Sequence, residues 1–299
     1  MPSPPSDLVT LPAGYGLRSL SAAERLELGD FLEDYLLVWE VPRRGHRYVV
    51  GVDVSDGINL DRSVIDVTRV ATIEEPDEQV AQFVTSQIDP VDLAYYIDVI
   101  GRFYCDDDKF EALVAIEVNN HGLATQAELA RHCGYQHFFV WQYEDKRNPA
   151  NRYSSNIGWY TSSRTRGIIL TRFRRAITAL DPLTGQPDYQ INSPFTMEEL
   201  KDFQTDGALV EAAASAGATD DCIMAAAISV HVAQTLYLET SEPLAEARHR
   251  LAAERLRAQT LAAHLAMRRD YINTDASVGE MDGREDYEGW HGAAGYDVA

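Results

Sequence analysis

The stretch Tyr48-Val-Val-Gly-Val-Asp-Val54 decides the fold class, because it is an apolar run of strand length that ends in a turn at Ser55-Asp-Gly57. The segments 63–70 and 78–88 follow, with alternating apolar and polar positions and many β-branched residues. This pattern is typical of strands that are half buried. We therefore expect three consecutive strands at the start of a β-sheet.

Helices and strands alternate in the next part of the chain. Ala112-Leu-Val-Ala-Ile-Glu-Val118 is a second apolar strand, interrupted by one acid, and it lies between segments whose apolar residues have helical spacing. The predicted helices are 91–104, 123–132, 164–180, 194–203 and 219–236, and a short strand is predicted at 137–141. This order indicates an α/β fold, with a mixed β-sheet flanked by helices on both faces.

The two ends of the chain differ from this central part. The capping box Ser21-Ala-Ala-Glu24 predicts a helix that runs to about Val38. From Leu244 to about Arg269, apolar residues fall seven apart between arginines, which predicts a helix that packs on its own domain or binds a partner. The expected organisation is an arm with a helix at 1–46, the sheet domain at 47–240, the basic helix at 241–272 and an acidic, disordered tail at 273–299.

Composition excludes several classes of protein. With 45% hydrophobic and 24% charged residues, the chain is neither fibrous nor mostly disordered. No run approaches the ~20 apolar residues of a membrane helix, and Met1-Pro-Ser-Pro-Pro-Ser6 lacks the features of a signal peptide. The three cysteines have no spacing typical of disulfide frameworks or zinc clusters. We therefore expect a soluble intracellular protein without membrane contact.

Charge is distributed unevenly along the chain. The net charge of −21 would repel nucleic acid if it were spread evenly. Residues 141–175, here called the basic island, contain eight Lys or Arg and two acids, whereas residues 271–299 contain seven acids and one Arg. The basic island is a candidate surface for a phosphate backbone, although ordinary surface arginines are an alternative interpretation. The candidate DNA contacts are Lys146, Arg147, Arg152, Arg164 and Arg166.

Four acids stand where the local pattern is apolar. Asp53 ends the first buried strand and Glu117 lies near the end of the second, while Asp220 and Asp221 open an otherwise apolar helix. A buried, unpaired carboxylate is costly, but a divalent cation can compensate for a cluster of them. The carboxyl ends of neighbouring strands share one edge of an open sheet, and a helix N-terminus can face that edge. Oxygen ligands without His or Cys select Mg²⁺ or Mn²⁺.

Each acid taken alone has a simpler interpretation. An acid at a strand end is usually solvated, and Asp220 and Asp221 follow Thr219 and can cap a helix. Together, however, these carboxylates can hold two ions ~3.5–4 Å apart, one to activate water and one to stabilise a leaving 3′-oxygen. This chemistry is that of a nuclease or a polynucleotidyl transferase.

Four motifs follow one another along the chain, namely Gly51-Val-Asp-Val-Ser-Asp-Gly57 with Asp61-Arg-Ser63, Val114-Ala-Ile-Glu-Val-Asn-Asn-His-Gly122, Gly158-Trp-Tyr-Thr-Ser-Ser-Arg-Thr-Arg166 and Gly217-Ala-Thr-Asp-Asp-Cys-Ile-Met-Ala225. In this order they resemble the nuclease domain of tailed-phage terminase large subunits. The similarity covers roughly residues 46–237, and Glu-x-Asn-Asn-x-Gly and Asp-Asp-x-x-Met-Ala are its most specific parts. It implies an RNase H-like fold and cleavage of concatemeric viral DNA during genome packaging.

The resemblance also implies roles for individual residues. The metal-binding and catalytic acids are Asp53, Glu117 and Asp220 or Asp221, and the sequence does not decide which of the adjacent pair is the principal ligand. Asp56 and Asp61 are accessory ligands or, more simply for Asp56, a solvated turn acid. Asn119 shapes the loop after the second acid. The implied cofactors are two Mg²⁺ or Mn²⁺ ions.

The sequence departs from complete large terminases in one respect. Its three lysines, Lys109, Lys146 and Lys201, do not form the Gly-x-x-x-x-Gly-Lys motif of a packaging ATPase. We therefore expect the ATPase on a separate chain or truncated away, with double-stranded DNA, portal protein and small terminase subunit as further partners in the host cell cytoplasm. Two alternatives remain open, namely a Holliday-junction resolvase-like nuclease of the same fold and a non-catalytic packaging adaptor.

Overall fold

A computed structural model describes residues 36–55, 62–86, 88–105, 110–144, 153–181, 185–205 and 219–237, together with position 23 and the C-terminal segments 250–254, 256–260 and 262–263. The chain divides into two compact units, Met1–His249 and Arg250–Ala299. The first unit contains the sheet and all the named helices and strands. None of the helices in the described ranges is both long and apolar enough to cross a membrane.

A mixed six-stranded sheet forms the centre of the first unit, in the order β1-β4-β3-β2-β5, with β8 pairing to β4. Its strands are β1 (Leu36–Val38), β2 (Tyr48–Asp53), β3 (Ser63–Arg69), β4 (Asp77–Thr85), β5 (Leu113–Ile116) and β8 (Tyr189–Gln190). Neighbours β1 to β4, β4 to β3 and β3 to β2 run antiparallel, whereas β2 to β5 and β4 to β8 run parallel. The three predicted consecutive strands are confirmed as β2, β3 and β4.

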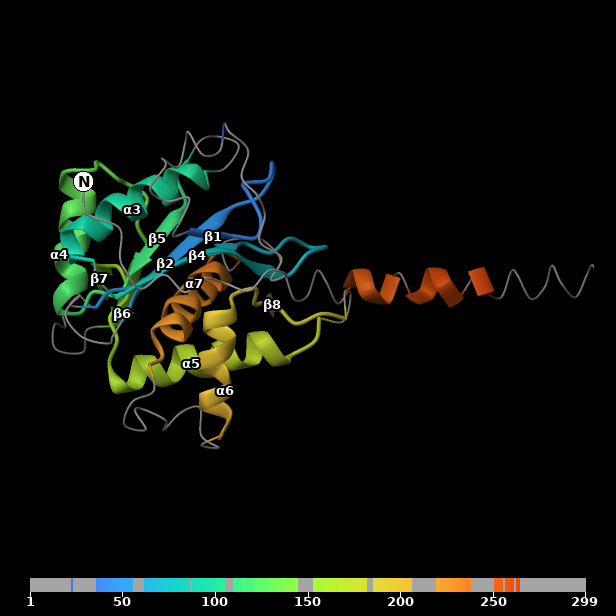
Figure 1. The fold of residues 1–299 in the computed structure, drawn as a ribbon. Coiled ribbons are helices and arrows are strands. Elements are labelled where there is room, and N and C mark those ends of the chain that lie inside the picture. Colours follow the sequence, from blue (N-terminus) through green and yellow to red (C-terminus); the bar gives the residue numbers. More distant parts are fainter. Residues whose placement is uncertain are drawn as a thin grey trace, which may run out of the picture. The chain divides into compact units, whose positions relative to one another are not determined.

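Helices cover both faces of the sheet, as Figure 1 shows, so the predicted α/β class is confirmed. On one face lie α3 (Pro90–Phe103) and α4 (Asn120–Arg131), and on the other lie α5 (Ser163–Thr178), α6 (Pro194–Thr205) and α7 (Asp221–Tyr237). The arrangement is consistent with the RNase H-like fold that the motifs imply. A separate hairpin, β6 (Val140–Glu144) with β7 (Tyr153–Ile157), was not predicted.

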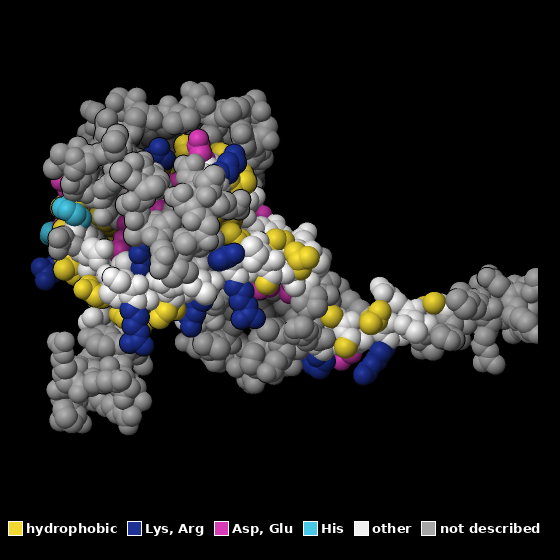
Figure 2. All heavy atoms as spheres, turned by 90° about the horizontal axis from the view of Figure 1, so that it is seen from below, with side chains coloured by type: hydrophobic (Ala, Val, Ile, Leu, Met, Phe, Trp, Pro, Cys, Tyr) yellow, Lys and Arg dark blue, Asp and Glu magenta, His cyan; other side chains and the backbone are white. Residues whose placement is uncertain are grey.

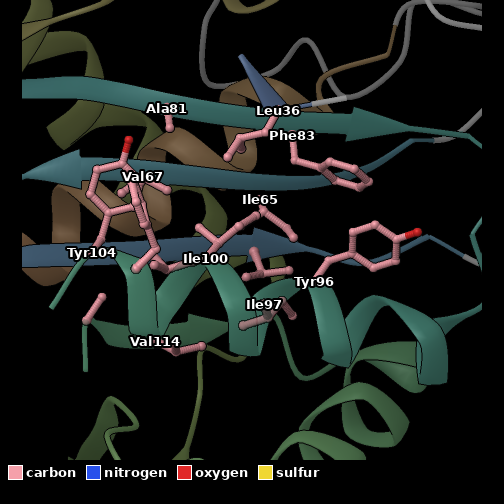
Figure 3. Close-up of a cluster of buried hydrophobic side chains, with 14 of the residues drawn as sticks. Leu36, Ile65, Val67, Ala81, Phe83, Tyr96, Ile97, Ile100, Tyr104 and Val114 are labelled. Atoms are coloured by element: carbon pink, nitrogen blue, oxygen red, sulfur yellow. The ribbon is translucent and has the colours of Figure 1, made fainter. Parts of the chain in front are cut away.

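Alternate side chains of β2 belong to two hydrophobic cores, one on each face of the sheet. Val50 and Val52 of β2 join the cluster under α3, which Figure 3 shows with Ile97 and Ile100. Val49, one position out of phase, joins the cluster under α5 and α7. Because the side-chain period of a strand is two, Asp53 points to the α7 face together with Val49.

Two predicted elements need correction. The helix expected to run to about Val38 does not reach it, because Leu36–Val38 is the edge strand β1, paired antiparallel with β4. Leu36 and Val38 are buried and Leu37 is not, which is the alternation of a strand. The strand expected at 137–141 begins at Val140, and Phe138 makes only an isolated bridge to Val114.

The ends of the chain are described only in part. The predicted C-terminal helix is helical at 250–254, 256–260 and 262–263, and the rest of it lies outside the described residues. The tail at 273–299 and all but position 23 of residues 1–35 also lie outside them. The domain boundaries therefore stay predictions, except that residues 36–38 of the expected arm belong to the sheet.

Candidate active site

Two of the predicted acids lie side by side at the ends of parallel strands. Asp53 is the last residue of β2, and Glu117 follows β5 directly. The strands are in register at Val52 and Ile116, and the backbone N–H of Glu117 donates to the carbonyl of Val52 at 2.8 Å. Both acids have the strand parity of residues that pack under α7. Asp53 and Glu117 therefore lie at one edge of the sheet, and their metal-binding and catalytic roles stay predictions.

Helix α7 brings the second pair of acids to the same edge. It crosses β2 at Gly51, where an added Cβ would lie 2.3 Å from the carbonyl oxygen of Ala225. Only a residue without a side chain lets the helix approach this closely. The first turn of α7, which begins at Asp221, therefore stands next to the end of β2 that carries Asp53. The packing of α7 on β2 thus explains why the first motif begins with glycine, at Gly51.

The three carboxylates of Asp53, Glu117 and Asp221 interact electrostatically. Loss of hydration on burial raises the pKa of Asp53 well above its ordinary value, and the charge of Glu117, a hydrogen bond with Glu117 and the charge of Asp221 raise it further. The site therefore brings like charges together where hydration is reduced, which is unfavourable without a compensating cation.

The adjacent aspartates Asp220 and Asp221 have different partners. Asp220 forms an ion pair with the guanidinium of Arg166. Asp221 accepts a hydrogen bond from the backbone N–H of Arg62 at 2.8 Å, and its charge acts on Asp53. The sequence did not decide which of these two aspartates is the principal metal ligand. In the structure the charge of Asp221 raises the pKa of Asp53, whereas the charge of Asp220 is neutralised by Arg166.

The loop after the second acid explains the Glu-x-Asn-Asn-x-Gly motif. The side-chain amide of Asn119 donates to Glu117 Oε1 at 2.8 Å, so it orients the carboxylate. A Cβ at Gly122 would lie 1.7 Å from the carbonyl oxygen of Glu117, so α4 begins against the backbone of the acid itself. Asn119 and Gly122 together fix both the side chain and the main chain of Glu117.

The predicted DNA contacts are only partly described. Arg164 is exposed in the first turn of α5, and Arg166, two residues on, is paired with Asp220 rather than free on the surface. Figure 2, seen from the side on which α5 lies in Figure 1, shows Lys and Arg side chains along this face. The exposed arginines of α5 are Arg164, Arg172, Arg174 and Arg175. Asp56, Asp61, Lys146, Arg147 and Arg152 lie outside the described residues.

Two buried acids near the site were missed by the sequence analysis. Glu199 of α6 accepts from the backbone N–H of Ile223, and no pattern in the amphipathic α6 segment signals this contact. Asp66 interrupts the apolar alternation of β3, which is the same signal that singled out Glu117. Asp66 is fully buried and accepts from Gln79 Nε2 at 2.5 Å and from the hydroxyl of Ser229 at 3.1 Å.

The donor set fits a hard divalent cation, since it contains carboxylate oxygens and a neighbouring amide but neither His nor Cys. Within the described ranges, no group of three or more His, Cys, Asp or Glu side chains is disposed to hold a metal ion as it stands. Asp53 and Glu117 are hydrogen-bonded to each other, and Asp220 is held by Arg166. The predicted four-acid metal site thus stays a prediction, for which this cluster supplies three interacting members.

Comparison with known proteins gives structural likeness only. No protein-family model matches the sequence, and no curated protein sequence is significantly similar to it. The structure is similar to the large terminase nuclease of thermophilic phage G20c with bound magnesium, at 19% identity and a TM-score of 0.44, over 66% of this chain and 87% of that one. For the large terminase nuclease domain of Thermus phage P74-26 the identity is 17% and the TM-score 0.40, over 65% and 84%. Structures of the G20c nuclease with bound zinc and with bound cobalt are also similar.

Proposed function

We propose that this chain is a divalent-metal-dependent DNA endonuclease that cuts concatemeric viral DNA during genome packaging. The observation that supports it most directly is the interaction of three carboxylates, Asp53, Glu117 and Asp221, at one edge of the sheet. Such a cluster is unfavourable without a compensating cation and is the ligand set that Mg²⁺ or Mn²⁺ prefers. The order of the four sequence motifs supports the packaging role.

Asp53, Glu117 and Asp221 would hold the metal, and Asp220 would join them if it left Arg166. When bound, divalent ions at such a site acidify water and offset charge that develops at a phosphodiester. Asn119 keeps the carboxylate of Glu117 in one orientation through its hydrogen bond. The backbone N–H of Arg62 does the same for Asp221. The protein's own contribution is therefore a preorganised ligand set on rigid strand ends and a helix tip.

We assign DNA binding to the exposed arginines of α5. The first of them is Arg164. Arg166 lies in the same turn and pairs with Asp220, beside the acid cluster. Arginines neutralise phosphates and so position a duplex without reading its sequence. A DNA backbone that follows α5 would then pass the acids at the tip of α7. The proposed substrate is double-stranded DNA.

Nicking of supercoiled plasmid by the full chain tests this function. We expect nicking with Mg²⁺ or Mn²⁺, none in EDTA, and none from Asp53→Asn under any of these conditions. Activity that persists in EDTA would contradict the metal dependence. Strong preference for four-way junctions over linear duplex would instead identify a junction resolvase on the same fold.

We also propose that the chain works with a packaging ATPase, on a separate chain or on a part that was truncated away, because its motifs resemble those of large terminase subunits. Co-purification of the phage packaging ATPase with the full chain and with a form lacking residues 1–35 tests this partnership and the role of the arm. Equal recovery with both forms would remove the arm as the docking element, and recovery with neither would contradict the partnership.

A further inference from the structure

The N-terminus of α7 is held by a carboxylate from another helix. The backbone N–H of Ile223, in the first turn of α7, donates to Glu199 Oε2 at 3.0 Å. Glu199 lies on α6 and is only 5% exposed. One buried acid thus accepts an N–H group of the first turn of α7.

The residue just before the helix, Asp220, is the one expected to accept that N–H group. Its carbonyl oxygen receives the N–H of Met224 at 2.8 Å, which is the first hydrogen bond of the helix and identifies Asp220 as the N-cap. An N-cap aspartate ordinarily accepts from the second or third helical N–H. Here the third, that of Ile223, donates to Glu199, and the carboxylate of Asp220 pairs with Arg166.

We infer that Glu199 is a positioning residue for the acids at the tip of α7, because it replaces Asp220 as the cap of the helix. Because Glu199 accepts the third N–H of the helix, neither Asp220 nor Asp221 is needed to accept it. Asp221 then keeps the hydrogen bond from the backbone N–H of Arg62, and its charge acts on Asp53. The inference rests on the proposed function, since it assigns Glu199 a role in holding the metal ligands.

The burial of Glu199 supports this role. A carboxylate withdrawn from water is unfavourable unless it is hydrogen-bonded, whereas an apolar side chain of the same length would fill the space at no such cost. An acid at this position is therefore explained by its acceptor oxygen Oε2, which receives the backbone N–H of Ile223. This contact places Glu199 against the turn that carries Asp221.

The matched pair Glu199→Met and Glu199→Gln tests the inference, because both side chains have the length of Glu and only Gln keeps a strong acceptor. Mn²⁺ binding to the full chain without DNA is measured by electron paramagnetic resonance, and folding by circular dichroism. Loss of an outer contact that orients metal ligands typically costs about 10- to 100-fold in metal affinity. We expect a loss of about 10-fold or more for Glu199→Met and recovery to within about threefold of wild type for Glu199→Gln.

The outcomes separate this inference from the proposed function. Wild-type Mn²⁺ affinity in folded Glu199→Met, with binding lost in Asp53→Asn, overturns the role of Glu199 and leaves the nuclease proposal intact. No Mn²⁺ binding by the wild-type chain contradicts both. If Glu199→Met does not fold, Glu199→Asp takes its place, since it withdraws the carboxylate from Ile223 by one methylene and keeps the charge; unchanged affinity there would equally overturn the inference.

Discussion

Arg166 and Asp220 form an ion pair that links the first turn of α5 to the residue preceding α7. The same guanidinium lowers the pKa of Asp53, against the larger effects of burial and of Glu117 that raise it. Arg166 therefore supplies positive charge to the acid cluster. It is also the residue through which the basic surface of α5 reaches the candidate active site.

Arg166→Ala is expected to bind Mn²⁺ more tightly and DNA more weakly than the wild type. Removal of a cation next to the acids makes their potential more negative, and a partly exposed ion pair of this kind is worth up to about 1 kcal/mol, or about fivefold in affinity. Arg164→Ala is the matched control, since Arg164 is exposed on the same turn. It should weaken DNA binding and leave Mn²⁺ affinity unchanged. Weaker Mn²⁺ binding by Arg166→Ala would show that Arg166 acts by orienting Asp220.

The adjacent aspartates should differ in their effect on metal binding. Asp221 interacts with Asp53, whereas Asp220 is neutralised by Arg166. We therefore expect Asp221→Asn to reduce Mn²⁺ affinity at least about tenfold more than Asp220→Asn does. Calorimetric titration of both variants measures the difference. The reverse order would identify Asp220 as the principal ligand and require Arg166 to leave it.

Gly51→Ala is expected to impair both stability and catalysis. The new Cβ would meet the carbonyl oxygen of Ala225 at 2.3 Å, so α7 must move away from β2. Overpacking of this kind typically costs about 1–3 kcal/mol of unfolding free energy. The displaced helix carries Asp221, so metal affinity should fall as well. A variant with normal stability by urea denaturation would contradict the close packing of α7 on β2.

Asp66 is expected to make the protein less stable as the pH rises from about 4 to 6. Burial raises the pKa of Asp66 from its usual 3.8 to about 6, despite hydrogen bonds from Gln79, Ser229 and Gln82 that lower it. In this range the folded state holds a proton that the unfolded state releases. The stabilisation is therefore complete below the pKa of Asp66 in the unfolded state, and it is lost as the pH rises through the pKa of Asp66 in the folded state. The effect is at most about 3 kcal/mol. In Asp66→Asn, unfolding free energies measured in urea should lack this decline.

His231 is expected to make the protein less stable as the pH falls, over nearly the same pH range in which Asp66 makes it less stable as the pH rises. Burial, and then the charge of Arg172, lower its pKa from the usual 6.5 to about 4. The imidazole packs on Trp159 and faces the guanidinium of Arg172 at 2.7 Å from Nδ1. The folded state therefore resists a proton that the unfolded state takes up, and stability is lost as the pH falls from about 6.5 to 4. His231→Gln should expose the slope that Asp66 causes, and an unchanged pH profile would contradict the burial of a neutral imidazole.

The sequence predicted the elements that repeat a regular period and missed those fixed by long-range contacts. The alternation and apolar runs at 48–54, 63–70 and 112–118 gave β2, β3 and β5, because strand period alone identifies them. Leu36–Val38 was assigned to a helix, because three residues carry no period and only pairing with β4 makes them a strand. Of the hairpin, the strand expected at 137–141 overlaps only the start of β6, and β7 was missed.

The candidate site was predictable in its acids but not in their partners. An acid inside an apolar segment is visible in the sequence, as Asp53, Glu117 and Asp221 were. The contacts of Arg166 with Asp220 and of Glu199 with Ile223 join residues 54 and 24 positions apart, respectively, and depend on how α5 and α6 pack against α7. No local pattern encodes such contacts. Asp66, by contrast, carried the same signal as Glu117 and could have been singled out.

The central claim is that Asp53, Glu117 and Asp221 together bind divalent cations. Anomalous diffraction from crystals of the protein grown with Mn²⁺ tests it most directly, because the signal locates the ion independently of any activity. We predict an anomalous peak within ligand distance of these carboxylates, with the hydrogen bond between Asp53 and Glu117 replaced by contacts to the ion. Saturating Mn²⁺ with no peak at this edge of the sheet, and with that hydrogen bond retained, would contradict the account.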